Sequence, residues 1–373
     1  MTILHVFSAM DRGGAELRTL DVMRRIDRDK YRFVFCTTSG RTGILDDEIR
    51  MLGGEVIVCA LGRGFAARFR KVIENVNPDV VHSHLHLTSG YILRGVQVPT
   101  RIAHLRSMGD GRADTLRRRV QRWTLRRLTR RNATKILSVS EGALDTQWSD
   151  WRGDPKFQVI YNGVPFAPFA EAENVETVRD EFTIPSDAPF FIHLGRLDAA
   201  KNHERLIAIF GEILRREPRA HLLLVGRSDG PYAAQRVALD ALIAKLPSPS
   251  QLKWAGERSD VARLLCAADA MIFPSRREGL PGAVTEACLA ATPVVSSDVP
   301  GACEIAARVA ERGLDMVTPL SLSAPDETWA KTALRAASQK FTIGQVHAAL
   351  KGSAFDLDTC VAQLQQVWDA KDK

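Results

Sequence analysis

The sequence predicts an α/β protein built from two doubly wound parallel sheets, and three observations support this prediction. Short apolar runs rich in β-branched residues alternate with helix-length amphipathic segments along the whole chain. These runs are apolar at nearly every position, which indicates strands buried on both faces, as in a parallel sheet covered by helices. The 373 residues are too many for one core of ordinary size and suit two domains.

The predicted strands form two sets separated by turn and breaker residues. The first set is Ile3–Ser8, Arg32–Thr37, Glu55–Leu61, Asp79–His84, Arg101–Leu105, Lys135–Ser140 and Gln158–Tyr161. The second set is Phe190–Gly195, His221–Gly226, Gln251–Ala255, Ala270–Pro274 and Pro293–Ser297. We therefore predict a Rossmann-like domain at 1–165, a linker at 166–188, a second Rossmann-like domain at 189–350 and a C-terminal helical segment at 351–373. The two domains are expected to face each other across a cleft, with ligands bound beyond the carboxyl ends of the strands.

Composition narrows the class of protein. A hydrophobic content of 45% with 25% charged residues is that of a folded soluble protein and not of a disordered one. The absence of any run of about 18 apolar residues excludes an integral membrane protein. The N-terminus enters a strand-like segment without the features of a secretory signal, so we expect a cytoplasmic protein. The six cysteines are scattered and mostly lie in apolar runs, so we expect buried reduced thiols and neither disulfides nor a zinc site.

Two glycines, Gly13 and Gly14, follow the first predicted strand and precede an amphipathic helix. Their amides could approach an anion closely at the helix N-terminus, where the helix dipole favours negative charge. A tight β–α turn without a ligand explains the same pattern. A dinucleotide fingerprint would need G-x-G-x-x-G and an acidic residue after the second strand, and the sequence has neither. Binding of NAD or FAD is therefore disfavoured.

Histidines mark the ends of two predicted strands in the first half. His82, His84 and His86 alternate and would share one face of an extended chain, as metal ligands can. A strand that ends near His84 places His86 elsewhere, and no carboxylate or cysteine flanks the set, so we expect no metal. His84 is a candidate for a polar contact in the cleft. His104 closes an apolar strand and is the better candidate for a hydrogen bond to a sugar hydroxyl or phosphate, although a core histidine with satisfied hydrogen bonds fits the same pattern.

Two cations follow the first strand of the second half. Arg196 stands at the end of this strand, and Lys201 lies five residues later at the start of a helix. Such a pair can converge on one diphosphate, to which Arg offers a planar fork and Lys a compact charge. We therefore predict a diphosphate site that offsets the charge of a leaving group without a metal. A chance pair of surface cations is the alternative, which the position at a strand end weakens.

Two glutamates enclose a Gly- and Pro-rich loop. Glu278 lies on the loop, and Glu286 lies about one turn into the following helix, whose other residues are small or apolar. A carboxylate on the buried side of such a helix needs hydrogen-bond donors, and ribose hydroxyls would supply two. The start of the helix near Pro281 and Gly282 presents free amides to a phosphate. A nucleotide sugar has the shape that satisfies these groups together.

These motifs resemble glycosyltransferase family 4, whose members are retaining nucleotide-sugar transferases with the GT-B fold. The matching pieces are Gly-Gly-Ala-Glu (13–16), Asp-Val-Val-His-Ser-His (79–84), Ser-Val-Ser-Glu-Gly (138–142), Tyr-Asn-Gly-Val (161–164), Gly-Arg-Leu-Asp (195–198) with Lys-Asn (201–202), and the E-x7-E pair around Gly279 and Leu280. The resemblance implies a hexosyl- or N-acetylhexosaminyltransferase of the exopolysaccharide or lipopolysaccharide type. It also implies catalysis without a metal or other cofactor, and retention by front-face substitution.

The resemblance also implies a role for each matching residue. Arg196 and Lys201 would hold the donor diphosphate, Glu286 the ribose, and Glu278 the hydroxyls of the donor sugar. The donor site would further include Gly279 and Leu280, with the nucleobase near Glu257 and Arg258. On the acceptor side His104 would sit beside the transferred sugar, with Gly13 and His84 nearby and the amide of Gly14 close to both diphosphate and acceptor. The segment 351–373 would pack back on the N-terminal domain.

The basic charge of the chain is concentrated in its first half. Residues 1–165 hold 28 basic and 17 acidic residues, a net charge of +11, whereas the remainder carries −4. Residues 112–131 alone contain nine arginines. We expect this segment to bind an anionic membrane surface, peripherally on the inner face of the plasma membrane. The side chains expected to do so are Arg117, Arg118, Trp123, Arg126 and Arg127. A solvated helix face explains the same run of charge.

Three classes of function are consistent with these patterns. The preferred class is a retaining glycosyltransferase that moves a sugar from a nucleotide-diphosphate sugar to a hydroxyl of a glycan or lipid-linked acceptor in cell-surface polysaccharide assembly. The second is another enzyme of the same fold, such as a nucleotide-sugar epimerase or a phosphorylase, although no pyridoxal-phosphate lysine stands out. The third is a nucleic-acid-binding protein that uses the arginine-rich helix. Its aromatic residues are not interleaved with the basic ones, so we expect no nucleic-acid partner.

Overall fold

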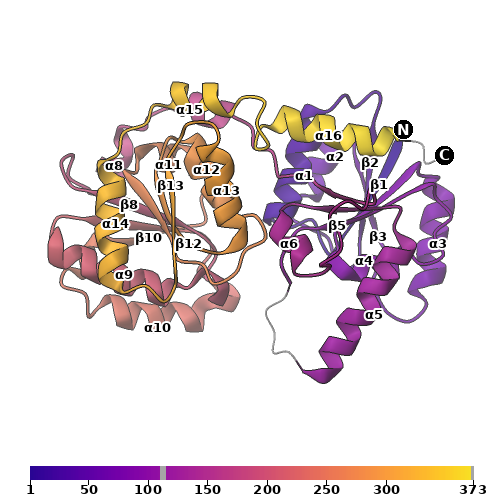
Figure 1. The fold of residues 1–373 in the computed structure, drawn as a ribbon, viewed down its shortest axis with the longest axis horizontal. Coiled ribbons are helices and arrows are strands. Elements are labelled where there is room, and N and C mark those ends of the chain that lie inside the picture. Colours follow the sequence, from indigo (N-terminus) through magenta and orange to yellow (C-terminus); the bar gives the residue numbers. More distant parts are fainter. Residues whose placement is uncertain (110–114, 371–373) are drawn as a thin grey trace. The chain divides into compact units, whose positions relative to one another are not determined.

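The computed structural model describes residues 1–109 and 115–370, which form two compact units. Unit 1 comprises Met1–Val164 and Ala354–Lys373, and unit 2 comprises Pro165–Ser353 (Figure 1). The end of the first domain and the start of the C-terminal segment lie within a few residues of the predicted boundaries, whereas the predicted linker 166–188 belongs to unit 2. Residues 112–114 of the predicted membrane-binding segment and residues 371–373 of the predicted C-terminal segment lie outside the described residues.

Unit 1 is built on a seven-stranded parallel sheet of order β3-β2-β1-β4-β5-β6-β7. The strands are β1 (Thr2–Phe7), β2 (Arg32–Thr37), β3 (Glu55–Val58), β4 (Val80–Ser83), β5 (Thr100–Leu105), β6 (Lys135–Ser138) and β7 (Phe157–Val159). The helices are α1 (Gly14–Arg25), α2 (Asp46–Met51), α3 (Phe65–Val76), η1 (His86–Thr88), α4 (Ser89–Ile92), α5 (Leu116–Asn132), α6 (Glu141–Asp145) and α16 (Leu357–Asp369). Alternate residues of the central strands enter two different core clusters, so both faces of the sheet are covered.

Unit 2 is built on a six-stranded parallel sheet of order β10-β9-β8-β11-β12-β13. Its strands are β8 (Phe190–Leu194), β9 (His221–Val225), β10 (Leu252–Gly256), β11 (Ala270–Phe273), β12 (Val294–Ser297) and β13 (Val317–Leu320). The helices from α7 to α11 are α7 (Ala167–Ala170), α8 (Thr177–Glu181), η2 (Ala199–Lys201), α9 (His203–Arg216), η3 (Gly230–Tyr232), α10 (Ala233–Ile243), η4 (Pro249–Gln251) and α11 (Val261–Ala267). The remaining helices are α12 (Gly282–Leu289), α13 (Pro300–Ala310), α14 (Asp326–Ser338) and α15 (Ile343–Leu350). The predicted α/β class with two doubly wound parallel sheets is confirmed.

The structure differs from the predicted elements in two places. β13 was not predicted because Thr318 and Pro319 interrupt its apolar run. Proline is tolerated there because β13 is an edge strand, which pairs on one side with β12. The segment predicted as a linker contains α7 and α8, and both helices contact α11 of unit 2.

The cysteines and helices bear on two further expectations. The structure contains free cysteines, of which Cys36, Cys59, Cys288 and Cys360 are buried, while Cys266 and Cys303 are partly exposed. The expectation of buried thiols is therefore correct for four of the six. Among the described residues, no helix combines the length and the apolar character needed to cross a membrane.

The helix α16 belongs to unit 1 and packs beside α1 (Figure 1). Apolar residues at helical spacing, including Leu357, Val361, Leu364 and Trp368, enter the core under one face of the sheet. The first residue of α16 lies so close to the segment after β7 that a Cβ on Gly163 would lie 2.6 Å from the Cα of Leu357. This explains the need for glycine in the Tyr-Asn-Gly-Val motif.

Candidate functional site

Each sheet has one point at which the direction of winding reverses, between β1 and β4 in unit 1 and between β8 and β11 in unit 2. The connections leaving these neighbouring strands go to opposite sides, which opens a crevice at their carboxyl ends. Most of the predicted site residues belong to the segments that follow these strands. The geometry of each unit is therefore best described from its reversal point.

In unit 2 the structure brings together two of the predicted residues. Lys201 follows β8 at the end of η2, and Glu278 lies on the loop after β11. The ammonium of Lys201 donates to a carboxylate oxygen of Glu278 over 2.7 Å, and both side chains are mostly buried. The ammonium also lies 4.8 Å from the ring centroid of Phe273, the last residue of β11. A cation is thus held at the reversal point between an acidic and an aromatic side chain.

Backbone contacts fix the two loops that carry this pair. The amide of Arg276 donates to the carbonyl of Ala200 (2.7 Å), and the side-chain amide of Asn202 donates to the carbonyl of Pro274 (3.0 Å). Asn202 adopts a left-handed conformation, with φ of 59°, which turns the chain sharply into α9. Among the described residues, the side-chain oxygen of Asn202 and the hydroxyl of Ser275 are buried without partners. Buried polar atoms normally have partners, so these atoms favour a site that takes up water or a polar ligand.

The N-terminus of α13 packs against the loop that carries Glu278. A Cβ on Gly301 would lie 2.0 Å from the carbonyl oxygen of Gly279, so only glycine permits this approach. Leu280 is buried beside it, with 7% of its surface exposed. Gly279 and Leu280 therefore shape the loop through packing, and α12 begins directly after Pro281. A Cβ on Gly282 would meet nothing within 4 Å, so there is open space beside the first residue of α12.

The other predicted donor residues of unit 2 lie around this pair. Arg196 opens the same loop as Lys201, is exposed, and makes no side-chain hydrogen bond or ion pair with any described residue. Glu286 lies in α12 and is partly buried. Glu257 is exposed after β10, whereas the guanidinium of Arg258 is tied to Asp260 (2.8 Å) and Glu181 (3.0 Å). These two carboxylates raise the pKa of Arg258, chiefly through the hydrogen bond to Asp260.

A buried histidine of unit 2 was missed by the sequence analysis. His193 lies in β8 under the loop of Lys201, and its Nδ1 donates to the carbonyl of Ile272 (2.8 Å). Its Nε2 therefore carries a lone pair, which has no partner among the described residues. Burial lowers the pKa of His193 well below its usual value, and the nearby charge of Lys201 acts in the same direction. A histidine within an otherwise apolar strand, two residues before the loop, was the available signal.

In unit 1 the predicted glycine loop leads into the helix α1. Gly13 is the N-cap residue, with extended backbone angles, and Gly14 is the first helical residue. Gly14 is exposed, and a Cβ there would meet nothing within 4 Å. Gly14 is thus open to a ligand, whereas a Cβ on Gly13 would lie 2.3 Å from a carboxylate oxygen of Glu16, so this side chain lies against the start of α1.

Three neighbouring strands of unit 1 place polar residues in a row on their buried face. Residues alternate between the two faces of a strand, so Ile3, Val80 and Ile102 enter one core cluster and the residues two positions later point the same way. In β1, β4 and β5 those later residues are His5, His82 and His104. His84 follows His82 just beyond the end of β4, and Arg106 follows His104 just beyond the end of β5, each on the same face. We call these five residues the histidine rows. His5 and His104 are each 1% exposed, which makes this an unusual concentration of imidazoles inside a core.

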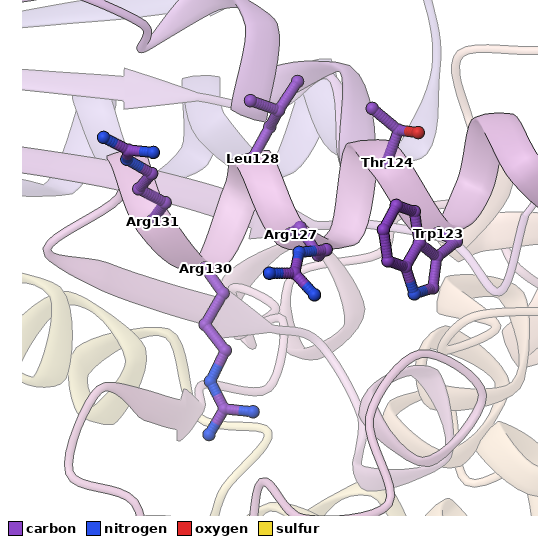
Figure 2. Close-up of a pocket in the computed structure, with 6 residues that line it drawn as sticks. All are labelled: Trp123, Thr124, Arg127, Leu128, Arg130 and Arg131. Carbon is purple, nitrogen blue, oxygen red and sulfur yellow. The ribbon is translucent and has the colours of Figure 1, made fainter.

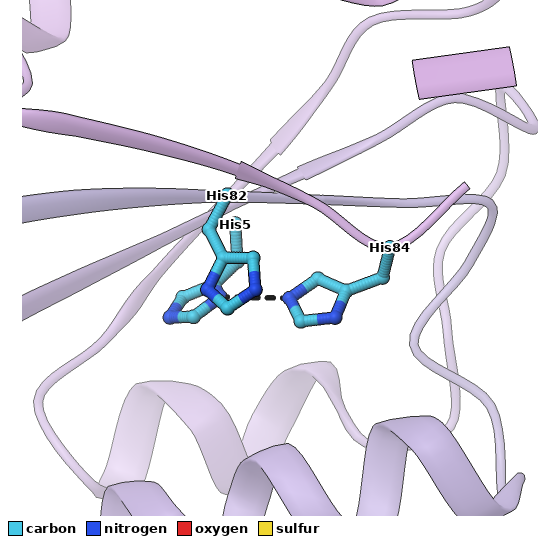
Figure 3. Close-up of side chains that lie close together, drawn as sticks. All are labelled: His5, His82 and His84. Atoms are coloured by element: carbon cyan, nitrogen blue, oxygen red, sulfur yellow. Dashed lines mark hydrogen bonds between the residues drawn. The ribbon is translucent and has the colours of Figure 1, made fainter. Parts of the chain in front are cut away.

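Hydrogen bonds connect these imidazoles in two pairs. Nδ1 of His5 lies 3.0 Å from Nε2 of His84 (Figure 3), and Nε2 of His82 lies 3.0 Å from Nδ1 of His104. Burial lowers the pKa of all four histidines, to about 3 for His5, and the charge of Arg106 adds to the effect. The four rings are therefore neutral at physiological pH.

The guanidinium of Arg106 donates hydrogen bonds to three side chains. Its Nε donates to Nδ1 of His84 (3.2 Å), and its terminal nitrogens donate to Oδ1 of Asn162 (2.6 Å) and the hydroxyl of Thr19 (3.4 Å). Burial lowers the pKa of Arg106 to about 10, which still leaves it charged at neutral pH. Both ring nitrogens of His84 are thus engaged within unit 1, so the predicted polar contact from His84 to a ligand has no free nitrogen to use.

Each of the two predicted interpretations of His104 agrees with part of the structure. The ring is buried and makes one hydrogen bond, as a core histidine would. Its Nε2 has no partner among the described residues, which a satisfied core histidine would not leave. His86, the third histidine of the alternating motif, begins η1 after β4 has ended and takes no part in the pairs.

Three of the buried histidines meet the geometric requirement for a metal. Ligand atoms of His5, His82 and His84 lie within 4.8 Å of one another. This differs from the sequence pattern, because His5 takes the place of His86. The bond from Arg106 occupies the lone pair on Nδ1 of His84, and its guanidinium would repel a dication placed there. The expectation that the chain needs no metal remains a prediction.

The arginine-rich segment forms α5, whose N-terminal half extends away from the rest of unit 1 (Figure 1). Leu116, Val120 and Trp123 are among the exposed large hydrophobic residues, with more than half of each surface accessible. The guanidinium of Arg127 lies 4.9 Å from the centroid of the Trp123 ring, and both line a shallow pocket with Thr124, Leu128, Arg130 and Arg131 (Figure 2). Arg117 is exposed and Arg118 partly buried. Arg126 instead donates to Gln147 (3.2 Å) and the carbonyl of Thr146 (3.1 Å) within unit 1.

Two protein-family models match the chain. Residues 12–167 match the model described as Glycosyltransferase Family 4, and residues 174–314 match the model described as Glycosyl transferases group 1. The first model covers the glycine loop, His82, His84, His104 and Arg106 of unit 1 but not His5, and the second covers the Lys201–Glu278 pair of unit 2.

Known proteins resemble the chain along its whole length. It is 28% identical to the capsular polysaccharide biosynthesis glycosyltransferase CapH of Staphylococcus aureus, with 99% of each chain covered. It is 29% identical to EpsF of Bacillus subtilis strain 168, covering 90% of this chain and 88% of EpsF. The fold matches the crystal structure of Anabaena HepE in complex with UDP and glucose with a TM-score of 0.81, at 19% identity and with 99% of this chain and 100% of HepE covered. The chain therefore belongs to glycosyltransferase family 4 and has the GT-B fold.

Proposed function

We propose that this protein is a retaining glycosyltransferase that takes a hexose or N-acetylhexosamine from a nucleotide-diphosphate sugar. Its acceptor is a hydroxyl of a glycan or lipid-linked glycan in polysaccharide assembly. The observation that carries the proposal is the Lys201–Glu278 pair at the reversal point of the unit 2 sheet, with exposed Arg196 on the same loop. The names of CapH and of the HepE complexes with UDP and UDP-glucose support polysaccharide assembly and a uridine carrier.

The residues of unit 2 supply the charges that this reaction needs. A departing diphosphate gains negative charge, which Arg196 and Lys201 stabilise, together with the N-terminus of α12. Glu278 accepts hydrogen bonds from hydroxyls of the donor sugar and positions Lys201, while Glu286 holds the ribose. The nucleobase lies beside the backbone near Gly256 and Glu257, since the side chain of Arg258 is already paired. The acceptor hydroxyl gives its proton to the leaving phosphate oxygen as the new glycosidic bond forms on the same face, so the anomeric configuration is retained.

Binding and transfer test this proposal separately. A thermal-shift screen of nucleoside diphosphates and their sugars should identify the donor, because a ligand present at a hundred times its Kd adds about 2.7 kcal/mol of stability. Glu286→Ala should abolish that shift, and Glu212→Ala is a matched control, because it removes another partly buried helical glutamate, near the C-terminal end of α9. An undiminished shift in Glu286→Ala would mean that the carboxylate does not hold the ribose.

Transfer is measured with the donor identified in this way. We expect release of the nucleoside diphosphate only with a hydroxyl acceptor, a product of unchanged anomeric configuration by NMR, and a rate insensitive to EDTA. Inversion of the configuration would contradict the retaining mechanism. Loss of turnover in EDTA that Mg²⁺ restores would contradict metal independence.

We also propose that α5 attaches the enzyme reversibly to anionic membranes, where lipid-linked acceptors reside. The exposed Leu116, Val120 and Trp123 supply apolar anchors, and the arginines between them attract anionic lipid. Each basic residue near such a surface contributes about 1 kcal/mol, so replacing Arg117, Arg119 and Arg127 with Ser should weaken vesicle binding by roughly a hundredfold. Arg126 is left intact in this variant because it contacts Gln147 and Thr146.

The matched control removes the same charge elsewhere on unit 1. Arg63, Arg70 and Arg94 are exposed, so their triple serine variant should bind phosphatidylglycerol vesicles nearly as well as the wild type apart from the general loss of charge. Equal binding by both variants would show that α5 is a solvated face without a membrane role.

A further inference from the structure

The hydrogen bonds around the histidine rows determine where each proton resides. A neutral imidazole carries one N–H donor and one lone pair, whereas the indole of Trp and the guanidinium of Arg can only donate. The indole nitrogen of Trp368 lies 3.3 Å from Nδ1 of His82, and Nε of Arg106 lies 3.2 Å from Nδ1 of His84. Nδ1 of His82 and of His84 must therefore be acceptors, and the proton of each ring resides on Nε2.

This assignment passes along each pair. His82 donates from Nε2, so Nδ1 of His104 must accept and the proton of His104 also resides on Nε2. By the same argument His84 donates to Nδ1 of His5, and the proton of His5 resides on Nε2. Two directed chains result, from Trp368 through His82 to His104 and from Arg106 through His84 to His5. The burial that lowers the pKa of these rings keeps them neutral, so the argument holds at physiological pH.

Both chains end on a buried N–H without a partner among the described residues, at Nε2 of His104 and Nε2 of His5. An unsatisfied buried donor is costly, which favours an acceptor atom at that position. The two ends differ in location. His5 lies in the middle of β1, whereas His104 is the penultimate residue of β5, at the carboxyl edge where ligands of such sheets bind.

We propose that Trp368 is a positioning residue, which acts through His82 to hold His104 in the Nε2–H tautomer. His104 then serves as a hydrogen-bond donor to an oxygen of the bound sugar or phosphate and cannot act as a base at Nε2. The ligand in this statement rests on the proposed function, but the tautomer does not. The helix α16 therefore contributes to the site of unit 1 indirectly, through the hydrogen bond that the indole of Trp368 donates to His82.

The tautomer can be observed without ligand. Long-range proton–nitrogen NMR spectra of the full-length protein labelled with ¹⁵N-histidine distinguish the two tautomers, and the signal of His104 is identified by its loss in His104→Gln. We expect the Nε2–H tautomer for His104 in the wild type. In Trp368→Phe, which keeps an aromatic ring but no donor, His82 is released and an Nδ1–H population of His104 should appear.

Two controls separate the lost donor from lost packing. Val367→Ala removes packing of the same helix from the same core cluster, and Trp329→Phe removes a buried indole donor in unit 2, where it bonds the carbonyl of Ser321. Neither should change the tautomer of His104. An Nδ1–H tautomer in the wild type, or an unchanged tautomer in Trp368→Phe, would overturn the role of Trp368.

Activity tests the second half of the proposal. His104→Gln places an amide N–H near the position of Nε2 and should retain more transfer than His104→Ala. Trp368→Phe should lower kcat about threefold to tenfold, the worth of one neutral hydrogen bond, without the matching loss in Val367→Ala. Equal activity of the Gln and Ala variants would refute a donor role for His104. A wild-type chain without any transfer would instead refute the proposed function, and the spectra would still decide the tautomer.

Discussion

The ion pair between Lys201 and Glu278 offers a test of the unit 2 geometry that needs no ligand. In a double-mutant cycle, Lys201→Met and Glu278→Gln are made singly and together, and the free energy of unfolding is measured for all four chains. The cycle isolates the coupling between the two side chains because each single change removes the same interaction.

The structure sets the expected magnitude. At the observed separation of 2.7 Å, two unit charges attract by about 1.5 kcal/mol in a medium like water and by about 6 kcal/mol at an effective dielectric constant of 20. The side chains are 22% and 15% exposed, so the interaction lies between these limits and part of it is offset by desolvation. A charge-assisted hydrogen bond in such a setting contributes about 1.5–3 kcal/mol. We expect a coupling near the lower end, about 1.5–2 kcal/mol.

Urea unfolding, followed by both circular dichroism and fluorescence, provides the measurement. The matched control is the cycle Lys331→Met with Glu327→Gln, a pair of similar length (2.8 Å) whose side chains are 67% and 55% exposed. The control coupling should be barely detectable, since exposed pairs contribute little. A coupling at Lys201–Glu278 no larger than that of the control would refute the claim that the two loops hold a fixed pair.

Three further predictions concern other parts of the chain. Gly301→Ala should force the Glu278 loop away from α13 and destabilise unit 2 by about 1–3 kcal/mol in urea unfolding, while Gly282→Ala should not; equal effects would contradict the packing. The buried histidines have pKa values below that of the unfolded chain, so the folded state binds fewer protons. Stability should be complete above about pH 6.5 and fall as pH drops toward about 3, by up to about 1.4 kcal/mol per pH unit for each histidine, and a flat profile between pH 7 and 5 would count against it. Burial raises the pKa of Cys288 to about 12, so iodoacetamide at pH 8 should label it only after unfolding, as followed by mass spectrometry.

The contact between Lys201 and Glu278 could be predicted because the parallel sheet brings the segments that follow β8 and β11 together. Residues just after neighbouring parallel strands necessarily share one edge of a sheet, so motifs that begin at strand ends converge even when they are far apart in sequence. The strands themselves were recognisable as apolar runs between breakers. β13 was the exception, because an edge strand that pairs on one side tolerates Thr318 and Pro319 and loses the apolar signature.

The histidine rows could not be found in the same way. His5 and His104 each look like an isolated polar residue in an apolar strand, and His82 looks like part of the alternating 82–86 motif. Only the pairing of β1, β4 and β5 brings the three rings together, because the register sets His5 opposite His82 and His104 bonds His82 from the next strand. The partner of His82 is harder still to predict, because Trp368 lies in the C-terminal helix and the whole of unit 2 separates the two residues in the sequence. Likewise, the role of Arg106 depends on three contacts from three separate segments.

The division of unit 1 into two stretches of sequence has a consequence for how the protein is made. A ribosome delivers Met1–Val164, then the whole of Pro165–Ser353, and only afterwards α16. While translation continues, the nascent first sheet lacks the cover that Leu357, Val361 and Trp368 supply, so a patch of its apolar surface stays open to water or to a chaperone. In any chain whose synthesis stops before Leu357, this apolar patch stays exposed permanently. Quality control in the cell can thus recognise an incompletely synthesised enzyme by a defect in the portion that was made first.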